Sequence, residues 1–139
     1  MKRPGLEHYD VKILLALLKS IEGRKDFFRW LMENGYPELG AFSNAICGDV
    51  EALQWLFGHK TDWLGIIVNA IDGMEQANAW LAKGCQPVNL MMAMASRRDA
   101  TAIAWLEERK LGIFLMLADA IHEVSEVLDA ERGGPYVRH

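Results

Sequence analysis

The sequence predicts an all-α fold, an α-solenoid of five stacked helix-turn-helix repeats of 25 residues each. Three observations predict it: a fixed period, apolar positions at helical spacing, and glycines that recur at one point of the period. The period divides the chain, without insertion or deletion, into blocks 11–35, 36–60, 61–85, 86–110 and 111–135. We expect a single domain over residues 1–139, with a lead-in arm at 1–10 that need not be ordered and a tail at 136–139.

The first half of each block is predicted to be an amphipathic helix. Apolar side chains at its fourth, seventh, eighth and eleventh positions fall on one helical face. The seventh position holds Leu17, Phe42, Ile67, Met92 and Leu117. The tenth position is small in every block, which lets neighbouring first helices approach closely. It holds Ser20, Ala45, Ala70, Ala95 and Ala120.

The second half of each block is predicted to be a helix that closes on Trp-Leu. The first four blocks carry this pair at Trp30-Leu31, Trp55-Leu56, Trp80-Leu81 and Trp105-Leu106. We expect these side chains to be core or structural rim, because tryptophan rarely stays exposed. The last block has Ala130-Glu131 instead, and its predicted second helix carries Glu123, Glu126, Asp129 and Arg132. Such polar substitution is typical of a capping repeat that faces water.

Glycine, aspartate and proline mark the predicted helix ends. The left-handed turn between the two helices is predicted at Gly23, Gly48 and Gly73. N-caps of second helices are predicted at Asp49 and Asp99, and proline begins first helices at Pro37 and Pro87. Each helix is only about 10 residues long and would not be stable alone, so stacking has to stabilise the fold.

The stretch 48–56, Gly-Asp-Val-Glu-Ala-Leu-Gln-Trp-Leu, resembles the Gly-His-x-Glu-Val-Val-x-x-Leu core of an ankyrin repeat. Ala45 matches one of the paired alanines that precede that glycine. The likeness extends over all five blocks, although the family's period is about 33 residues and its Thr-Pro-Leu-His tetrapeptide and projecting β-hairpin are missing here. The resemblance implies an ankyrin-like solenoid that binds proteins and is not catalytic. The alternative is another short α-solenoid repeat family.

Composition argues against several function classes. The chain has 15 Lys and Arg against 19 Asp and Glu, a net charge of −4 and no basic run, so we expect no nucleic-acid partner. No apolar run approaches the roughly 20 residues of a membrane span, and we expect a cytoplasmic protein without a membrane partner. Cys47 and Cys85 lack CxxC spacing and the four histidines are scattered, which predicts reduced thiols, no metal site and no cofactor.

The side of the first helices opposite the apolar stripe is predicted to be the concave binding surface of the solenoid. Its two columns hold Lys19, Asn44, Asn69, Met94, Asp119 and Glu22, Cys47, Asp72, Arg97, His122. The predicted polar contacts to a partner are Asn44, Asn69, Asp72, Arg97, Asp119 and His122. The alternative is a solvated face on which Asp72 and Arg97 form an ordinary surface ion pair worth less than about 1 kcal/mol.

A second predicted surface is an apolar patch near the end of the chain, where two predicted helices are apolar all round. The patch would consist of Leu90, Met91, Met94, Leu115 and Met116. A patch of this kind marks a site of interaction or self-association. The alternatives are that Tyr136 and Val137 of the tail fold back over it, or that these helices are internal. Trp63, at a junction between blocks, is predicted to pack between helices or, if exposed, to anchor a partner.

The sequence contains no nucleophile paired with a base, no convergent carboxylates and no phosphate-binding glycine loop. We therefore expect a non-catalytic interaction module that binds a protein partner or itself, as a homo-oligomer, through the concave or the C-terminal apolar surface. The alternative is a small-ligand-binding protein or an enzyme whose pocket lies in the concave groove, with Asp72, Arg97 and His122 as its polar groups.

Overall fold

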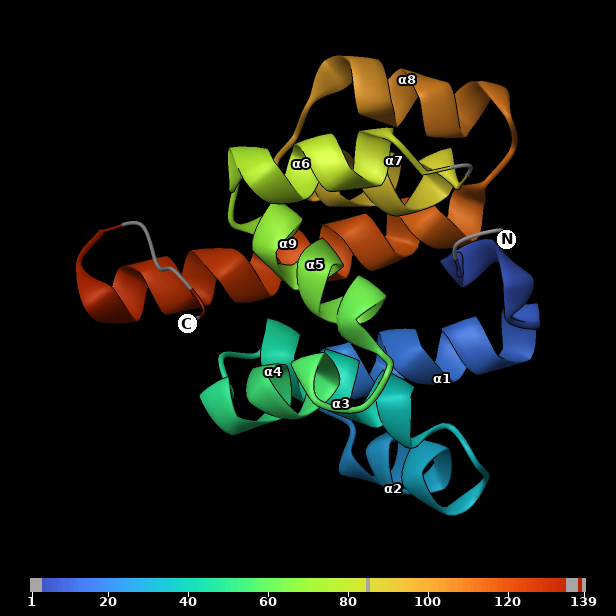
Figure 1. Cartoon of the computed structure of the whole chain (residues 1–139), viewed down its shortest axis with the longest axis vertical. Helices are drawn as coiled ribbons and strands as arrows, with labels where there is room; N and C mark the ends of the chain where they lie inside the picture. Colours follow the sequence, from blue (N-terminus) through green and yellow to red (C-terminus); the bar gives the residue numbers. More distant parts are fainter. Residues whose placement is uncertain (1–3, 85, 135–137, 139) are drawn as a thin grey trace.

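The computed structural model describes residues 4–84, 86–134 and 138, and these form nine α-helices, a short 3-10 helix η1 (Leu6–His8) and no strand (Figure 1). The all-α class is therefore confirmed. Four helical hairpins come first: α1 (Val11–Ile21) with α2 (Lys25–Glu33), α3 (Pro37–Ile46) with α4 (Val50–Phe57), α5 (Asp62–Ile71) with α6 (Glu75–Ala82), and α7 (Pro87–Ser96) with α8 (Ala100–Glu108). One longer helix, α9 (Gly112–Arg132), follows them.

The helix boundaries repeat in the predicted register. Successive first helices after α1 begin 25 residues apart, at Pro37, Asp62, Pro87 and Gly112. The predicted turn glycines have left-handed backbones, with φ of 98° at Gly23, 100° at Gly48 and 83° at Gly73. The predicted caps form as well, since the Asp49 and Asp99 side chains accept hydrogen bonds from the second-helix backbone at 3.2 and 3.0 Å.

In the part of the chain that the structure describes, three residues other than glycine also have left-handed backbones: Lys60 (φ 60°), Arg98 (φ 65°) and Lys110 (φ 56°). Lys60 and Lys110 end their blocks, where the first block has Gly35 with φ 90°. A side chain at such a φ brings its Cβ too close to the following carbonyl oxygen. The two lysines therefore hold backbone strain that glycine would relieve.

Replacing Lys60 or Lys110 with glycine should raise the free energy of unfolding by about 0.5 kcal/mol each, because the relieved strain exceeds the added entropy of the unfolded chain. Chemical denaturation followed by circular dichroism measures the change. Lys83→Gly is the matched control, since Lys83 has φ −78° in the right-handed region and should lose stability instead. A loss of stability in Lys60→Gly equal to that control would contradict the strain.

The fifth block departs from the prediction, because residues 112–132 form one continuous helix instead of two. The predicted second helix of this block, and the turn before it, are therefore wrong. The position of the turn glycine is occupied by Glu123, and the helix continues to Gly133, which caps it in the left-handed conformation with φ 73°. None of the helices in the described ranges combines the length and the hydropathy needed to cross a bilayer.

The first helices of the hairpins close into a ring with α9. Each packs on the next, from α1 to α3, α5, α7 and α9, and α9 in turn packs on α1 (Figure 1). The layer inside the ring is the seventh-position column, Leu17, Phe42, Ile67, Met92 and Leu117, all fully buried in one hydrophobic cluster. The apolar stripe thus faces the inside of the ring, and the opposite side of the first helices, predicted as the concave surface, faces away from it: Asn44 lines a cavity with Phe28 of α2 and Trp55 of α4.

The second helices lie outside this ring. Each contacts the first helix that follows it, as α2 does α3 and α8 does α9. The leucine of each Trp-Leu pair is buried, at Leu31, Leu56, Leu81 and Leu106. The preceding tryptophans lie at the outer rim: Trp30 stacks on Tyr36, Trp55 stacks on His59, and the Arg109 guanidinium lies over Trp105. Trp63 is buried, as expected for a side chain that packs between helices.

Pro4 and Leu6 of the predicted lead-in arm contact α7 of the fourth hairpin, and Tyr9 contacts Tyr36 and Glu38 of the second. Leu6 of η1 is fully buried, and its backbone N–H donates to Oδ1 of Asn89 at 3.0 Å. The Asn89 amide Nδ2 in turn donates to the carbonyl oxygen of Pro4 at 3.1 Å. Asn89 is the polar exception in the apolar fourth-position column, and these bonds satisfy its buried side chain.

Candidate functional site

The predicted concave residues Asn44 and Asn69 lie in the last turns of α3 and α5, Asp72 and Arg97 directly follow α5 and α7, and Asp119 and His122 lie within α9. Asn44 and Asn69 are half-buried, and Arg97 is exposed. Asp119 is exposed and accepts a hydrogen bond from Arg98 at 2.5 Å. Lys19 and Glu22 form an exposed pair with a nitrogen to oxygen distance of 3.3 Å.

One contact recurs between successive blocks at these helix ends. The side chain at the twelfth position of a block forms a hydrogen bond with the backbone carbonyl at the eleventh position of the block before it. That carbonyl belongs to the last turn of a first helix, where no intrahelical donor is left for it. The Cys47 thiol donates to the carbonyl oxygen of Ile21 at 3.8 Å, and partial burial raises the pKa of that thiol. Nδ1 of His122 lies 3.1 Å from the carbonyl oxygen of Ser96, and Nε2 lies 3.0 Å from Oε1 of Glu126.

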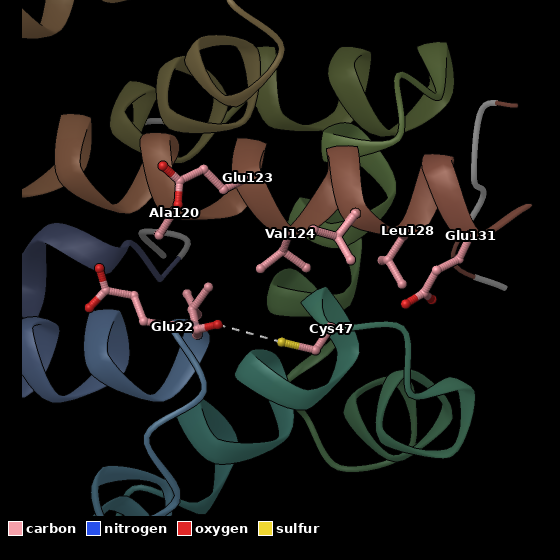
Figure 2. A pocket seen from close by; sticks show the side chains of 9 residues that line it. Glu22, Cys47, Ala120, Glu123, Val124, Leu128 and Glu131 are labelled. Carbon is pink, nitrogen blue, oxygen red and sulfur yellow. Dashed lines mark hydrogen bonds between the residues drawn. The ribbon is translucent and has the colours of Figure 1, made fainter. Parts of the chain in front are cut away.

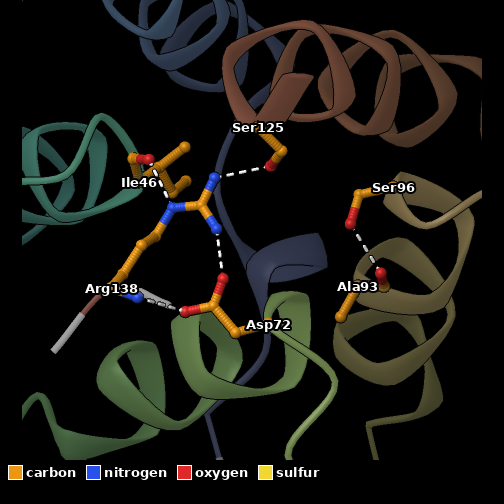
Figure 3. Close-up of polar contacts among 6 residues, drawn as sticks. All are labelled: Ile46, Asp72, Ala93, Ser96, Ser125 and Arg138. Carbon is orange, nitrogen blue, oxygen red and sulfur yellow. Dashed lines mark hydrogen bonds and ion pairs between the residues drawn. The ribbon is translucent and has the colours of Figure 1, made fainter. Parts of the chain in front are cut away.

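In the third block this position is Asp72, whose carboxylate cannot donate to the Ile46 carbonyl. Arg138 supplies the donors instead (Figure 3). Its Nε donates to the Ile46 carbonyl oxygen at 2.6 Å, its Nη1 to Oδ1 of Asp72, and its backbone N–H to Oδ2 of Asp72 at 2.9 Å. Its Nη2 donates to the hydroxyl of Ser125 at 2.5 Å.

The ion pair between Asp72 and Arg138 is buried, with side chains 1% and 2% exposed. This corrects the expectation of an ordinary surface ion pair at Asp72. A cavity of about 300 Å³ lies beside it, lined in part by Ser96, His122 and Asp129. The predicted polar groups Asp72, Arg97 and His122 all line this cavity, with the Arg138 guanidinium bound to Asp72.

The predicted apolar patch is mostly packed against the core. Four of its members, Leu90, Met91, Met94 and Leu115, are half-buried and contact the hydrophobic cluster. Met116 remains 50% exposed. Tyr136 and Val137, which were expected as alternative cover, lie outside the described residues.

A groove of about 530 Å³ lies between α9 and the ends of α1 and α3, and the sequence reasoning missed it (Figure 2). Its floor is apolar, formed by Ile21, Ala120, Val124, Val127 and Leu128. Three exposed carboxylates surround it, Glu22, Glu123 and Glu131, and Cys47, the residue after α3, lines it with its thiol directed at the Ile21 carbonyl. We call this cavity the α9 groove.

The α9 groove exists because the second half of α9 has no outer helix packed on it. This half extends beyond the hairpins, where the other blocks turn back (Figure 1). Val127 on the groove floor is 57% exposed. The signal in the sequence was the spacing of Val124, Val127 and Leu128, which is one face of a helix, within a segment expected to face water.

Among the described residues, no group of three or more His, Cys, Asp or Glu side chains is arranged to hold a metal ion. Comparison of the chain with models of protein families, with curated proteins and with solved structures finds no match.

Proposed function

We propose that the protein is a non-catalytic protein-interaction module, an ankyrin-like helical solenoid of the cytoplasm, and that it binds its partner in the α9 groove. The observation that carries this proposal is the partly exposed apolar floor of the groove, with Val127 57% exposed and Val124 and Leu128 half-buried, inside a rim of carboxylates. An exposed apolar surface with a polar rim is the usual composition of a protein-binding site.

The rim of the groove favours a basic, amphipathic segment of another protein. Glu22 and Glu123 lie toward one end and Glu131 toward the other (Figure 2), so lysine or arginine at either end of a bound segment would meet a carboxylate. Leucine-like side chains between them would cover Val124, Val127 and Leu128. A second copy is disfavoured in this groove, because it would bring the same carboxylates of a chain with net charge −4 together.

A fluorescently labelled helical peptide of leucine and lysine tests the groove. We expect saturable binding by fluorescence anisotropy that weakens as salt is added, since the rim charges are screened. Val127→Glu should weaken binding by about tenfold, equivalent to about 1.4 kcal/mol for one lost apolar contact in the floor. The double variant Glu123→Lys with Glu131→Lys should weaken binding at least as much.

Matched controls separate the groove from the overall charge of the protein. Val11→Glu replaces another exposed valine, and Glu107→Lys with Glu108→Lys makes the same charge change on α8. Both should bind the peptide within about twofold of the unmodified chain, because surface changes elsewhere leave the floor intact. Equal losses in the groove variants and in these controls, with helicity unchanged, would rule out the α9 groove as the docking site.

A further inference from the structure

We propose that Asp72, Ser125 and the Ile46 carbonyl form an arginine-binding pocket, which Arg138 fills within the chain and which an arginine residue of a partner protein can fill in its place. This arginine pocket uses a different face of α9 from the α9 groove. It does not depend on the function proposed for that groove.

The acceptors of the arginine pocket come from three helices that are distant in the sequence. Ile46 ends α3, Asp72 follows the end of α5, and Ser125 lies in α9 (Figure 3). Each of the three guanidinium nitrogens has an acceptor, and together these acceptors match the planar fork of arginine. A lysine ammonium is a compact point charge and cannot reach three acceptors placed around a plane.

The pocket binds an arginine residue and not only a guanidinium group. One carboxylate oxygen of Asp72 accepts from the side chain of Arg138, and the other accepts from its backbone N–H at 2.9 Å. A ligand without a peptide N–H, such as an alkylguanidine, would lose this hydrogen bond to Oδ2 of Asp72. Since the Asp72 side chain is 1% exposed, a lost donor there is costly.

The helices of the ring supply only hydrogen-bond acceptors to this pocket, so the donors must come from a residue outside these helices. At Cys47 and His122 the block's own side chain meets the carbonyl of the preceding helix. At Asp72 the pocket instead presents a carbonyl and a carboxylate, both acceptors, at the negative ends of two helix dipoles. Arg138 lies beyond α9, whose last residue is Arg132, so its exchange for another arginine requires no helix to unfold.

The neighbouring cavity gives an incoming arginine access to the same acceptors. The cavity of about 300 Å³ is lined by Asp72 and Ser125 as well as by Glu126 and Asp129, whose carboxylates offset the positive charge of Arg97 in the same lining. Arg138 acts there as a competitor within the chain. Its occupancy reduces the apparent affinity for a partner's arginine by the fraction of molecules in which the pocket is free.

The full chain carrying Arg138→Ala, titrated with N-acetyl-L-arginine amide, tests the proposal, because this ligand carries both the guanidinium and the peptide N–H. We expect saturable binding by calorimetry, a higher melting temperature, and an apparent affinity at least about tenfold above that of the unmodified chain. N-acetyl-L-lysine amide should not bind, and ethylguanidine should bind more weakly. Adding Asp72→Asn should abolish binding, whereas adding Asp119→Asn, an exposed carboxylate, should leave it unchanged.

If the Arg138→Ala variant does not fold, recovery of folding on adding the ligand becomes the test. In that case N-acetyl-L-arginine amide should restore the helical circular dichroism signal, and the lysine compound should not. The proposal is overturned if the arginine compound neither binds nor restores folding, if lysine replaces it equally, or if binding survives Asp72→Asn.

Discussion

Replacing Phe42 with alanine should lower the free energy of unfolding by about 3–5 kcal/mol, the usual cost of deleting a fully buried aromatic ring. Phe42 is 0% exposed and belongs to the layer inside the ring of first helices. Neighbours from five helices surround this layer, so the structure has little freedom to collapse around the space left by the ring. The loss is about a third to a half of the roughly 10 kcal/mol by which a domain of this size is stable.

Urea denaturation followed by circular dichroism measures this loss, with Phe57→Ala as the matched control. Phe57 is also a helical phenylalanine, but it is 44% exposed at the end of α4. Its replacement should cost less than about 1.5 kcal/mol, because half of its ring surface already faces water. Similar losses for the two variants would contradict a closed ring with a dry interior.

The hairpins could be predicted from the sequence because each carries its own stop and start signals. The first and third turns have a glycine, Gly23 and Gly73, and the second has both Gly48 and the N-cap Asp49. The fourth turn has no glycine, yet Asp99 caps α8 and Arg98 adopts the left-handed backbone. Either signal alone is therefore sufficient to end one helix and begin the next.

The fifth block shows what happens when both signals are absent. Glu123 stands at the glycine position and Val124 at the cap position, and α9 continues through both. The prediction of a turn there came from register alone, which carries no local physical cause. The same replacement exposes Val124 and Val127 on an uncovered half-helix, and so creates the α9 groove.

Ring closure and the arginine pocket depend on contacts too distant in the sequence for periodicity to reveal. The packing of α9 on α1 follows from the small rotation between successive hairpins, which side-chain packing sets. Two residues nevertheless carried a signal. Asn89 stands in an apolar column and Asp72 at a buried helix end, and each takes a polar partner from outside its own hairpin.

Replacing Asp72 with alanine should lower the free energy of unfolding by about 2–4 kcal/mol. Removing one member of a buried ion pair leaves the other charge without compensation, at a cost of about 3–5 kcal/mol where that charge is held in place. Arg138 lies outside the helices and can move into water, which reduces the cost. The Ile46 carbonyl and the Ser125 hydroxyl then lose their partner too, and these losses keep the effect well above that of a surface pair.

Asp119→Ala is the matched control, since Asp119 pairs with Arg98 at 2.5 Å but is 61% exposed. An exposed pair of this kind contributes less than about 1 kcal/mol. A double-mutant cycle of Asp72→Ala with Arg138→Ala should give a coupling energy of about 1–3 kcal/mol, against less than about 0.5 kcal/mol for Asp119→Ala with Arg98→Ala. If the two cycles gave the same small coupling, Arg138 would not stabilise the fold through Asp72. The Ile46 carbonyl would then be hydrated instead of bound by Arg138.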